Sequence, residues 1–286
     1  MKKILNKYED FNKLLINKYI PIPGLSSLYV PQSICQVNEY YLVGYYYGGK
    51  FKKRNSLIYI IDKDGYVVNK VFLDDKYHCG GIDVDINSNS LYITASGGYV
   101  NRYNLRDILN FDNKYIIPSN KFNIDRDRSL ISSITGKSSI SYLNIHNGKI
   151  YLGNFNNNGK SIVKVLKLDS NGIINCNSIK IINIPYDNIQ GMCIYNYNNM
   201  DYYIFSSSYG RWNDSYIYIS KFINDNFITV KKIKCPPMSE QINNINNGSV
   251  GIIFESGSLR YFNSRDKVKF ICYLDIKKVL DKKKNV

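Results

Sequence analysis

Short apolar runs rich in Ile, Val and Tyr alternate with polar positions along the chain, and Asn, Gly and Asp separate the runs. This pattern is typical of strands joined by tight turns. A segment with a polar opening and two such strands recurs five times: "PQSICQVNEYYLVGYYY", "CGGIDVDINSNSLYITAS", "SSISYLNIHNGKIYLGNF", "QGMCIYNYNNMDYYIFSSS" and "SEQINNINNGSVGIIFES". The five openings lie about 50 residues apart, a spacing that indicates a repeat architecture.

Further strands follow within the period. A third strand is legible in "SLIYIID", "GYVNRYNL", "SIVKVLKLD" and "SYIYISKF", and a fourth in three copies. Four antiparallel strands in each of five periods predict an all-β, five-bladed β-propeller. A six-bladed ring would need a blade hidden between Leu105 and Lys137, where "LRDILNF" predicts a short helix instead. A β-sandwich or barrel with accidental spacing is the remaining alternative.

The domain boundaries follow from the same pattern. Apolar Ile4, Leu5, Phe11, Leu14 and Leu15 predict a helix outside the ring, so we expect an N-terminal helical extension over residues 1–24. A single propeller domain should span 25–276, with "SSLYV" (26–30) as the outer strand that closes the last blade. Residues 277–286 form a basic tail.

The composition limits where in the cell the chain is expected to work. No uncharged apolar run approaches the length of a membrane span. The N-terminus has the lysines of a signal peptide but lacks its apolar region, so we expect a cytoplasmic chain, or a mature form without its leader. The six scattered cysteines form no CxxC pair, which argues against a zinc ribbon and predicts reduced, buried thiols. We expect a monomer.

The net charge of +15 raises the question of nucleic acid. Thirty of the 38 basic residues are lysine, and Lys, Asn, Ile and Tyr are abundant together. These four residue types share AT-rich codons, so genome composition accounts for the charge. Nucleic-acid binding is therefore not expected.

The special residues of the sequence fall on one face of the predicted ring. In a propeller, the loop before each inner strand and the loop between the second and third strands share a face, which we call the top face. The loops before the inner strands supply Gln32, His78, Ser138 or Ser139, Gln190 and Glu240. The turns of the opposite face are ordinary polar turns. Non-identical polar groups around one axis predict a pocket for a polar ligand.

Each candidate has a functional and a structural interpretation. His78 could be a general base or a ligand contact, or it could hydrogen-bond between blades. Glu240 and Glu255 should meet at the top of one blade, where they could do acid–base work or hold a cation, or Glu240 could pair with Arg211 instead.

The loop "SSSYGRWNDS" adds further candidates. Arg211 suits a carboxylate, phosphate or sulfate group. Tyr209 and Trp212 could form a stacking wall or pack between blades. The basic loop "KFKKRN", with Lys50, Lys52, Lys53 and Arg54, could steer an anion or simply be solvated.

No nucleophile elbow, P-loop, HExxH or dinucleotide glycine motif is present. No cofactor and no metal site are expected. A calcium ion in the channel could bind carboxylate and carbonyl oxygens, but too few carboxylates converge to predict one. Asp83, in "GIDVDIN", could also face the channel.

The elements "IQGMCIY", "SSSYGR", "NDSYIYI", "PPMSEQI" and "IIFESGS" together resemble a group of bacterial β-propeller proteins, from "VPQSI" through "CYLDI". The resemblance implies the fold and the top face, and no reaction. Five-bladed calcium-dependent nucleotidases are similar in architecture only. They place several acidic residues around the channel, where this sequence has Gln32, His78 and Gln190.

Two functions remain as hypotheses. One is binding of a small polar or anionic ligand, such as a sugar or metabolite, in the top-face pocket. His78 or Glu240 would be the base of any hydrolase or lyase activity. Gln32, Gln190, Tyr209, Arg211, Trp212 and Glu255 would bind the ligand. The other is a protein-interaction scaffold that uses the aromatic-rich face.

Overall fold

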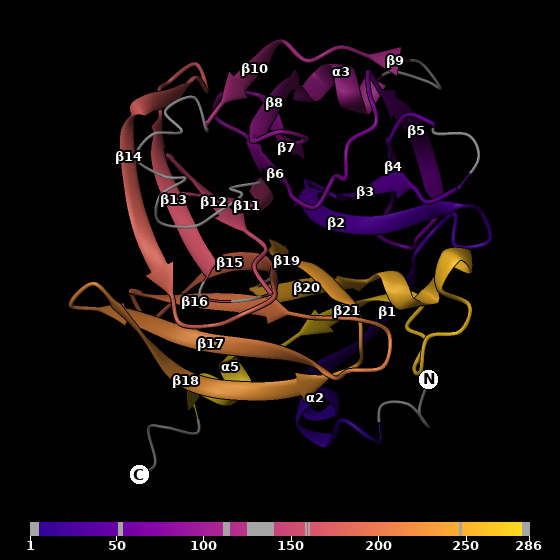
Figure 1. Cartoon of the computed structure of the whole chain (residues 1–286), viewed down its shortest axis with the longest axis vertical. Coiled ribbons are helices and arrows are strands. Elements are labelled where there is room, and N and C mark those ends of the chain that lie inside the picture. The colour runs from indigo at the N-terminus through magenta and orange to yellow at the C-terminus, as the bar shows by residue number, and fades with distance from the viewer. Residues whose placement is uncertain are drawn as a thin grey trace.

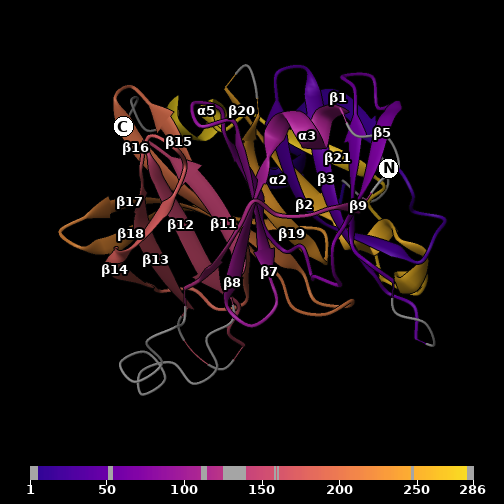
Figure 2. The same cartoon turned by 90° about the horizontal axis from the view of Figure 1, so that it is seen from above.

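The computed structural model of the chain describes residues 6–50, 54–110, 115–124, 140–157, 159, 161–245 and 248–281. Its strands form five sheets around one axis (Figure 1), each with four antiparallel strands and one with a short parallel strand added at its edge, so the predicted five-bladed β-propeller is confirmed. Figure 2 shows the ring from the side. The innermost strand of each blade contacts the innermost strands of both neighbouring blades, which closes the ring.

Written from the inner to the outer strand, the first blade contains β2 (Tyr29–Val37), β3 (Tyr40–Tyr47), β4 (Leu57–Ile61) and β5 (Val67–Leu73), with the short β9 (Tyr115–Ile116) at its edge. The second blade contains β6 (Ile82–Asp85), β7 (Ser90–Ala95), β8 (Tyr99–Asn104) and β10 (Asn120–Asn123), and the third contains β11 (Ile140–His146), β12 (Lys149–Asn154), β13 (Ser161–Leu168) and β14 (Ile174–Ile184). The fourth blade contains β15 (Ile189–Tyr197), β16 (Met200–Ser207), β17 (Ser215–Ile223) and β18 (Asn226–Cys235), and the fifth contains β19 (Ser239–Ile245), β20 (Ser249–Phe254), β21 (Phe270–Leu274) and β1 (Leu15–Pro21). The helices are α2 (Glu9–Leu14), α3 (Leu105–Asn110), α5 (Lys277–Leu280) and the 3₁₀ turns η1 (Glu255–Gly257) and η2 (Leu259–Tyr261).

The hairpin turns opposite the top face have the expected chemistry. Asn147 and Gly148 join β11 to β12 with φ angles of 49° and 67°. Two consecutive left-handed residues make the turn that best matches the twist of the flanking strands, and Asn–Gly favours it. Asn198 and Asn199 repeat this geometry between β15 and β16.

The first strand of the chain closes the ring, and here the prediction was wrong. β1 pairs antiparallel with β21, with Ile20 opposite Ile271 and Pro21 opposite Phe270. "SSLYV" instead leads into β2, the inner strand of the first blade. Helix α2 ends at Leu14, so the predicted helical extension over residues 1–24 is shorter than expected, and part of it belongs to the fifth blade. Residues Leu15–Pro21 contain Ile, Tyr and a terminal Pro, which favour an extended edge strand over a helix.

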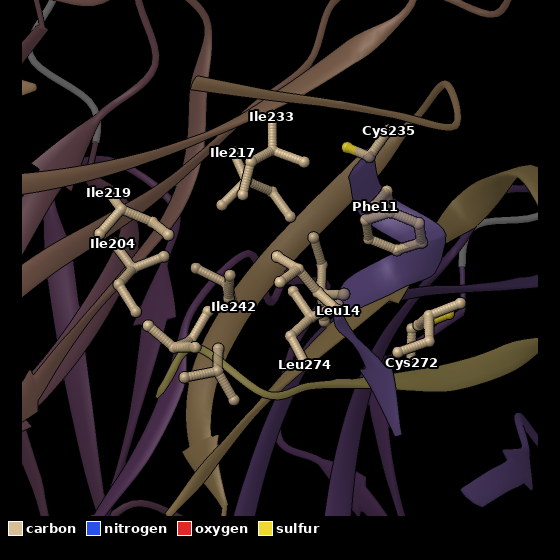
Figure 3. Packing of buried hydrophobic residues seen from close by; sticks show 14 of the residues in the cluster. Phe11, Leu14, Ile204, Ile217, Ile219, Ile233, Cys235, Ile242, Cys272 and Leu274 are labelled. Carbon is tan, nitrogen blue, oxygen red and sulfur yellow. The ribbon is translucent and has the colours of Figure 1, made fainter. Parts of the chain in front are cut away.

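Helix α2 packs on the outside of the ring between the fourth and fifth blades. Phe11 and Leu14 are buried in a cluster that Figure 3 shows together with side chains of β16, β17, β18, β19 and β21. The ring of Phe11 meets that of Phe254 edge-on, with centroids 6.1 Å apart. This packing fixes the segment that precedes the closing strand.

The stretch between Leu105 and Lys137 forms no sixth blade in its described part. It contains α3, the short β9 on the first blade, and β10, the outer strand of the second blade. Residues 125–139, with the predicted site residues Ser138 and Ser139, lie outside the described residues.

Two expectations from composition can be compared with the structure. All six cysteines are free, and five are buried, Cys176 being the exposed one. In the described part of the chain, no helix is long and apolar enough to cross a membrane.

Candidate functional site

An axial cluster of Asp83, Asn144, Gln241 and Asn243 joins the inner strands below the top face. The Gln241 side chain accepts hydrogen bonds from the backbone N–H groups of Ile34 and Ile82 at 3.1 and 3.0 Å. Its amide nitrogen donates to the carbonyl groups of Ile82 and Leu143 at 2.8 and 3.1 Å. One side chain of the fifth blade therefore binds the inner strands of the first, second and third blades.

Asp83 lies at the centre of this axial cluster, so it does face the channel. Its carboxylate accepts from Asn144 at 2.9 Å and from Asn243 at 3.0 Å. The backbone N–H groups of Ile145 and Val84 donate to it as well. Burial raises the pKa of Asp83 to about 6, although these four donors favour the charged form.

Above the axial cluster, β-bulges turn polar side chains out of the regular register. The register of the β2–β3 pairing shifts between Pro31 and Ser33, where Gln32 is the extra residue. The register of the β15–β16 pairing shifts between Ile189 and Gly191, where Gln190 is the extra residue. The shift in β19 contains Glu240. Bulges re-aim side chains at functional sites. Three of the five polar openings found in the sequence, Gln32, Gln190 and Glu240, therefore lie in bulges.

Glu240 and Glu255 meet at the top of the fifth blade. The backbone N–H of Glu255 donates to the carbonyl oxygen of Met238 at 3.1 Å, and the Glu255 charge acts on Glu240, two residues further along β19; we call Glu240 and Glu255 the carboxyl pair. Glu240 is 3% exposed. Glu255 accepts a hydrogen bond from the Gln32 side chain at 2.8 Å, which links the fifth blade to the first.

Burial raises the pKa of both carboxyl groups. For Glu240 the charge of Glu255 adds to burial and raises the pKa well above 4.5. The pKa of Glu255 is raised to about 7, because burial outweighs the hydrogen bonds from Gln32 and Tyr261 and the charges of Arg260 and Arg211. Near neutral pH the carboxyl pair therefore contains one proton donor and one group close to its titration midpoint.

This arrangement makes stability depend on pH. The folded state keeps its protons on the carboxyl pair to higher pH than the unfolded state, so the free energy of unfolding should fall as the pH rises from about 4.5 to about 7. Glu240→Gln cannot ionise. Above about pH 8 it should be more stable than the wild type by about 1–3 kcal/mol, and the difference should shrink towards about pH 5.

Urea unfolding across this pH range measures the effect. Glu39→Gln, at an exposed turn on the opposite face, is the matched control and should change little. A constant difference between Glu240→Gln and the wild type at every pH would contradict the raised pKa.

A ladder of rings and guanidinium groups leads away from the carboxyl pair. The hydroxyl groups of Tyr46 and Tyr261 hydrogen-bond at 2.9 Å. The guanidinium carbon of Arg260 lies 5.7 Å from each of these two rings, and that of Arg211 lies 4.8 Å from the ring of Tyr261. The imidazole of His78 stacks on Tyr46 with centroids 4.8 Å apart. The ladder thus connects the second, first, fifth and fourth blades.

One end of the ladder opens into a cavity of about 420 Å³, which we call the top-face cavity. It is lined by Tyr46, Tyr47, Gly49, Lys50, Arg54, Ser56, Lys76, Tyr77, His78, Ser96 and Arg260. Four of these side chains are cations, and none is a carboxylate. The cavity should therefore have a strongly positive potential.

The His78 side chain lines this cavity and is exposed to solvent there, but many protein atoms lie around it and reduce its hydration. Burial, together with the charge of Arg260, lowers its pKa. The imidazole is therefore held in its neutral form at neutral pH, and it stacks rather than forming the hydrogen bond between blades that was considered from the sequence.

The loop of Arg211 takes a different position from the one predicted. Arg211 donates to the Asn263 side chain at 2.8 Å, and no ion pair with Glu240 forms among the described residues. Tyr209 and Trp212 are 53% and 61% exposed, so they do not pack between blades. Arg265 fixes the loop, since its guanidinium donates to the carbonyl oxygen of Trp212 at 2.7 Å and also pairs with Asp214.

The structure thus brings Gln32, Glu240 and Glu255 together, with Arg211 beside them through Tyr261. His78 lies at the far end of the ladder. Tyr209 and Trp212 lie on the rim, and Gln190 is half-buried in its own bulge. In the described part of the chain, no group of three or more His, Cys, Asp or Glu side chains is placed to hold a metal ion.

Sequence reasoning missed several residues of the site, among them Tyr46, Lys76, Arg260 and Tyr261. Tyr46 lies within β3 and has the appearance of an ordinary strand residue. Arg260 and Tyr261 follow the motif "ESGS" after Leu259, in the long segment between β20 and β21. Their position five and six residues after Glu255 was the available signal.

The fold defines the class of this chain, a five-bladed β-propeller. No protein family and no curated protein matches its sequence. Two similar solved structures are hydrazine synthase of Kuenenia stuttgartiensis, at 9% identity and a TM-score of 0.46, and the Dos1 propeller, at 11% identity and a TM-score of 0.40. The matches cover 81% and 78% of this chain but only 58% and 52% of those chains.

Proposed function

We propose that this protein binds a small anionic ligand in the top-face cavity. The observation that carries the proposal is the lining of that cavity, where Lys50, Arg54, Lys76 and Arg260 surround a volume of about 420 Å³ without a carboxylate. Holding these four positive charges close together costs electrostatic free energy. A bound carboxylate, phosphate or sulfate group would offset that repulsion.

The aromatic walls add a second element of recognition. Tyr46 and His78 are stacked, and Tyr47 and Tyr77 complete the wall of the cavity. Flat rings beside cations suit a ligand that has both an anionic group and an apolar or sugar-like face. Arg260 is the central contact, because it is held between two rings and donates to the carbonyl oxygen of Gly48.

Replacing Arg260 should weaken binding most. Arg260→Gln removes the guanidinium but keeps a polar side chain, and we expect the affinity to fall about 10- to 100-fold, which is the range for a charge-assisted hydrogen bond. Isothermal titration calorimetry with inorganic phosphate, sulfate and galacturonate at two salt concentrations measures this. Binding should also weaken at the higher salt concentration.

Lys63→Gln serves as the control, because Lys63 is an exposed lysine in the turn between β4 and β5, on the face opposite the cavity. It should bind the probes as the wild type does. The proposal is wrong if no probe binds, or if Arg260→Gln and Lys63→Gln have the same affinity for each probe.

A protein-binding role for the rim is the second candidate. Tyr209, Trp212 and Phe262 are 53%, 61% and 69% exposed, and the contact of Arg265 with Trp212 brings their loops together. Exposed aromatic residues of this kind are typical of interface centres. Trp212→Ala should abolish capture of such a partner and leave anion affinity unchanged. Loss of anion affinity in this variant would place Trp212 in the ligand site instead.

A further inference from the structure

A chain of hydrogen-bonding groups leads from the top-face cavity to the carboxyl pair. Tyr46 lines the cavity, and its hydroxyl group bonds that of Tyr261 at 2.9 Å. The Tyr261 side chain also lies close enough to Glu255 to lower the pKa of that carboxyl group. Glu255 is held on its other side by Gln32 at 2.8 Å, and its charge acts on Glu240. No binding role requires this chain, because the cations already account for the attraction of an anion.

The groups in the chain differ in what they can do with a proton. Burial raises the pKa of Tyr46 and of Tyr261, so both phenols remain protonated at neutral pH. A protonated phenol can accept a proton only if it donates its hydroxyl proton to the next group at the same time. The ionisable end of the chain is the carboxyl pair, and the two tyrosines would transmit a proton to it.

The cations around the chain fit one kind of reaction. Arg260 lies between the two tyrosine rings and also lines the cavity, and Arg211 lies over Tyr261. When a proton leaves the carbon atom next to a carboxylate, a second negative charge develops on that carboxylate. Guanidinium groups placed beside it stabilise this charge. A phosphate or sulfate ester gives its neighbouring C–H bond much less acidity.

We propose that the ligand of the top-face cavity is a hydroxy-carboxylate, such as a sugar acid, and that Tyr46, Tyr261 and Glu255 remove the proton from the carbon atom next to its carboxylate. This inference rests on the proposed function, since the ligand must first bind beside Arg260.

The step balances within the site. The C–H electron pair moves into the carbon–carbon bond to the carboxyl group, which becomes an enediolate held by Arg260. The proton passes to the oxygen of Tyr46 while the Tyr46 proton passes to Tyr261 and that of Tyr261 to the Glu255 carboxylate. Reversal of the same path returns a proton to carbon. In deuterated water, the returned atom is deuterium once Glu255 has exchanged with solvent.

Proton NMR in deuterated water tests the proposal with galacturonate and gluconate as probes. The wild type should exchange the hydrogen next to the carboxylate. Glu255→Gln should exchange it at least about 100-fold more slowly, the usual contribution of a general base, while calorimetric affinity changes by less than about threefold. Tyr261→Phe should show the same split, because it keeps the ring under Arg211 and Arg260 and removes only the hydroxyl group.

Two controls make the outcome decisive. Glu39→Gln and Tyr66→Phe change an exposed acid and an exposed tyrosine away from the site and should exchange at the wild-type rate. If Glu255→Gln fails to fold, Tyr261→Phe decides alone. Probes that bind without exchange overturn the inference and leave the proposed function intact. Undiminished exchange in Tyr261→Phe overturns it as well, and probes that do not bind remove both proposals.

Discussion

Replacing Gln241 by leucine is expected to lower the free energy of unfolding by about 3–6 kcal/mol. Leucine has a similar volume but offers no hydrogen bond. The backbone N–H groups of Ile34 and Ile82 and the carbonyl groups of Ile82 and Leu143 would lose a partner at a buried site. Each buried polar group without a partner costs about 1–3 kcal/mol. Urea unfolding followed by circular dichroism measures the change.

Gln36→Leu is the matched control for this experiment. Gln36 also lies on an inner strand, β2, but it is only half-buried and its amide donates near the surface, to the carbonyl oxygen of Asn38. Its replacement should cost less than about 1 kcal/mol. If Gln241→Leu costs no more than this control, the axial cluster is not what holds the inner strands together.

Gly81→Ala should be the second strongly destabilising substitution, at about 3 kcal/mol. A Cβ atom at this position would lie 2.4 Å from the backbone nitrogen of Leu143 and 2.8 Å from the carbonyl carbon of Tyr142. Both are backbone atoms of the third blade, so no side chain can turn away, and the second blade must shift instead. Because Gly81 lies three residues after His78, the same shift should weaken anion binding.

Gly251→Ala provides the comparison, since its Cβ atom would lie 3.2 Å from the end of the Ile245 side chain, which can move. This variant should lose less than about 1 kcal/mol and keep its affinity for the anionic probes. Thermal unfolding and calorimetry on both variants give the two readouts. Equal stability of Gly81→Ala and Gly251→Ala would show that the blades tolerate separation.

The repeat could be predicted from the sequence because each blade contains the same succession of apolar strands and polar turns. Asn147–Gly148 and its counterparts require left-handed backbone, and such turns are visible without a structure. The closing strand could not be predicted in the same way. β1 has no neighbouring partner in the sequence, and its apolar residues continue those of α2, so its pairing with β21 depends on a contact between the two ends of the chain.

The site was predictable where the repeat itself marked it. Gln32 and Glu240 stand out because a bulge at each strand opening places a polar residue where the pattern expects an apolar one. Arg260 and Tyr261 lie outside the repeat, so periodicity carries no information on them. Gln241 reads as one more polar residue beside Glu240, and its four bonds appear only when three other blades surround it.

The pairing of β1 with β21 also bears on how the protein is made. During synthesis β1, which completes the fifth blade, emerges before every other strand of the propeller, and its partner β21 emerges after them. Until then, the apolar face of α2 and both edges of β1 have no partner, and exposed strand edges favour aggregation. The ring therefore closes only after β21 has left the ribosome, and a propeller that stops before β21 would carry an open edge on both β1 and β20.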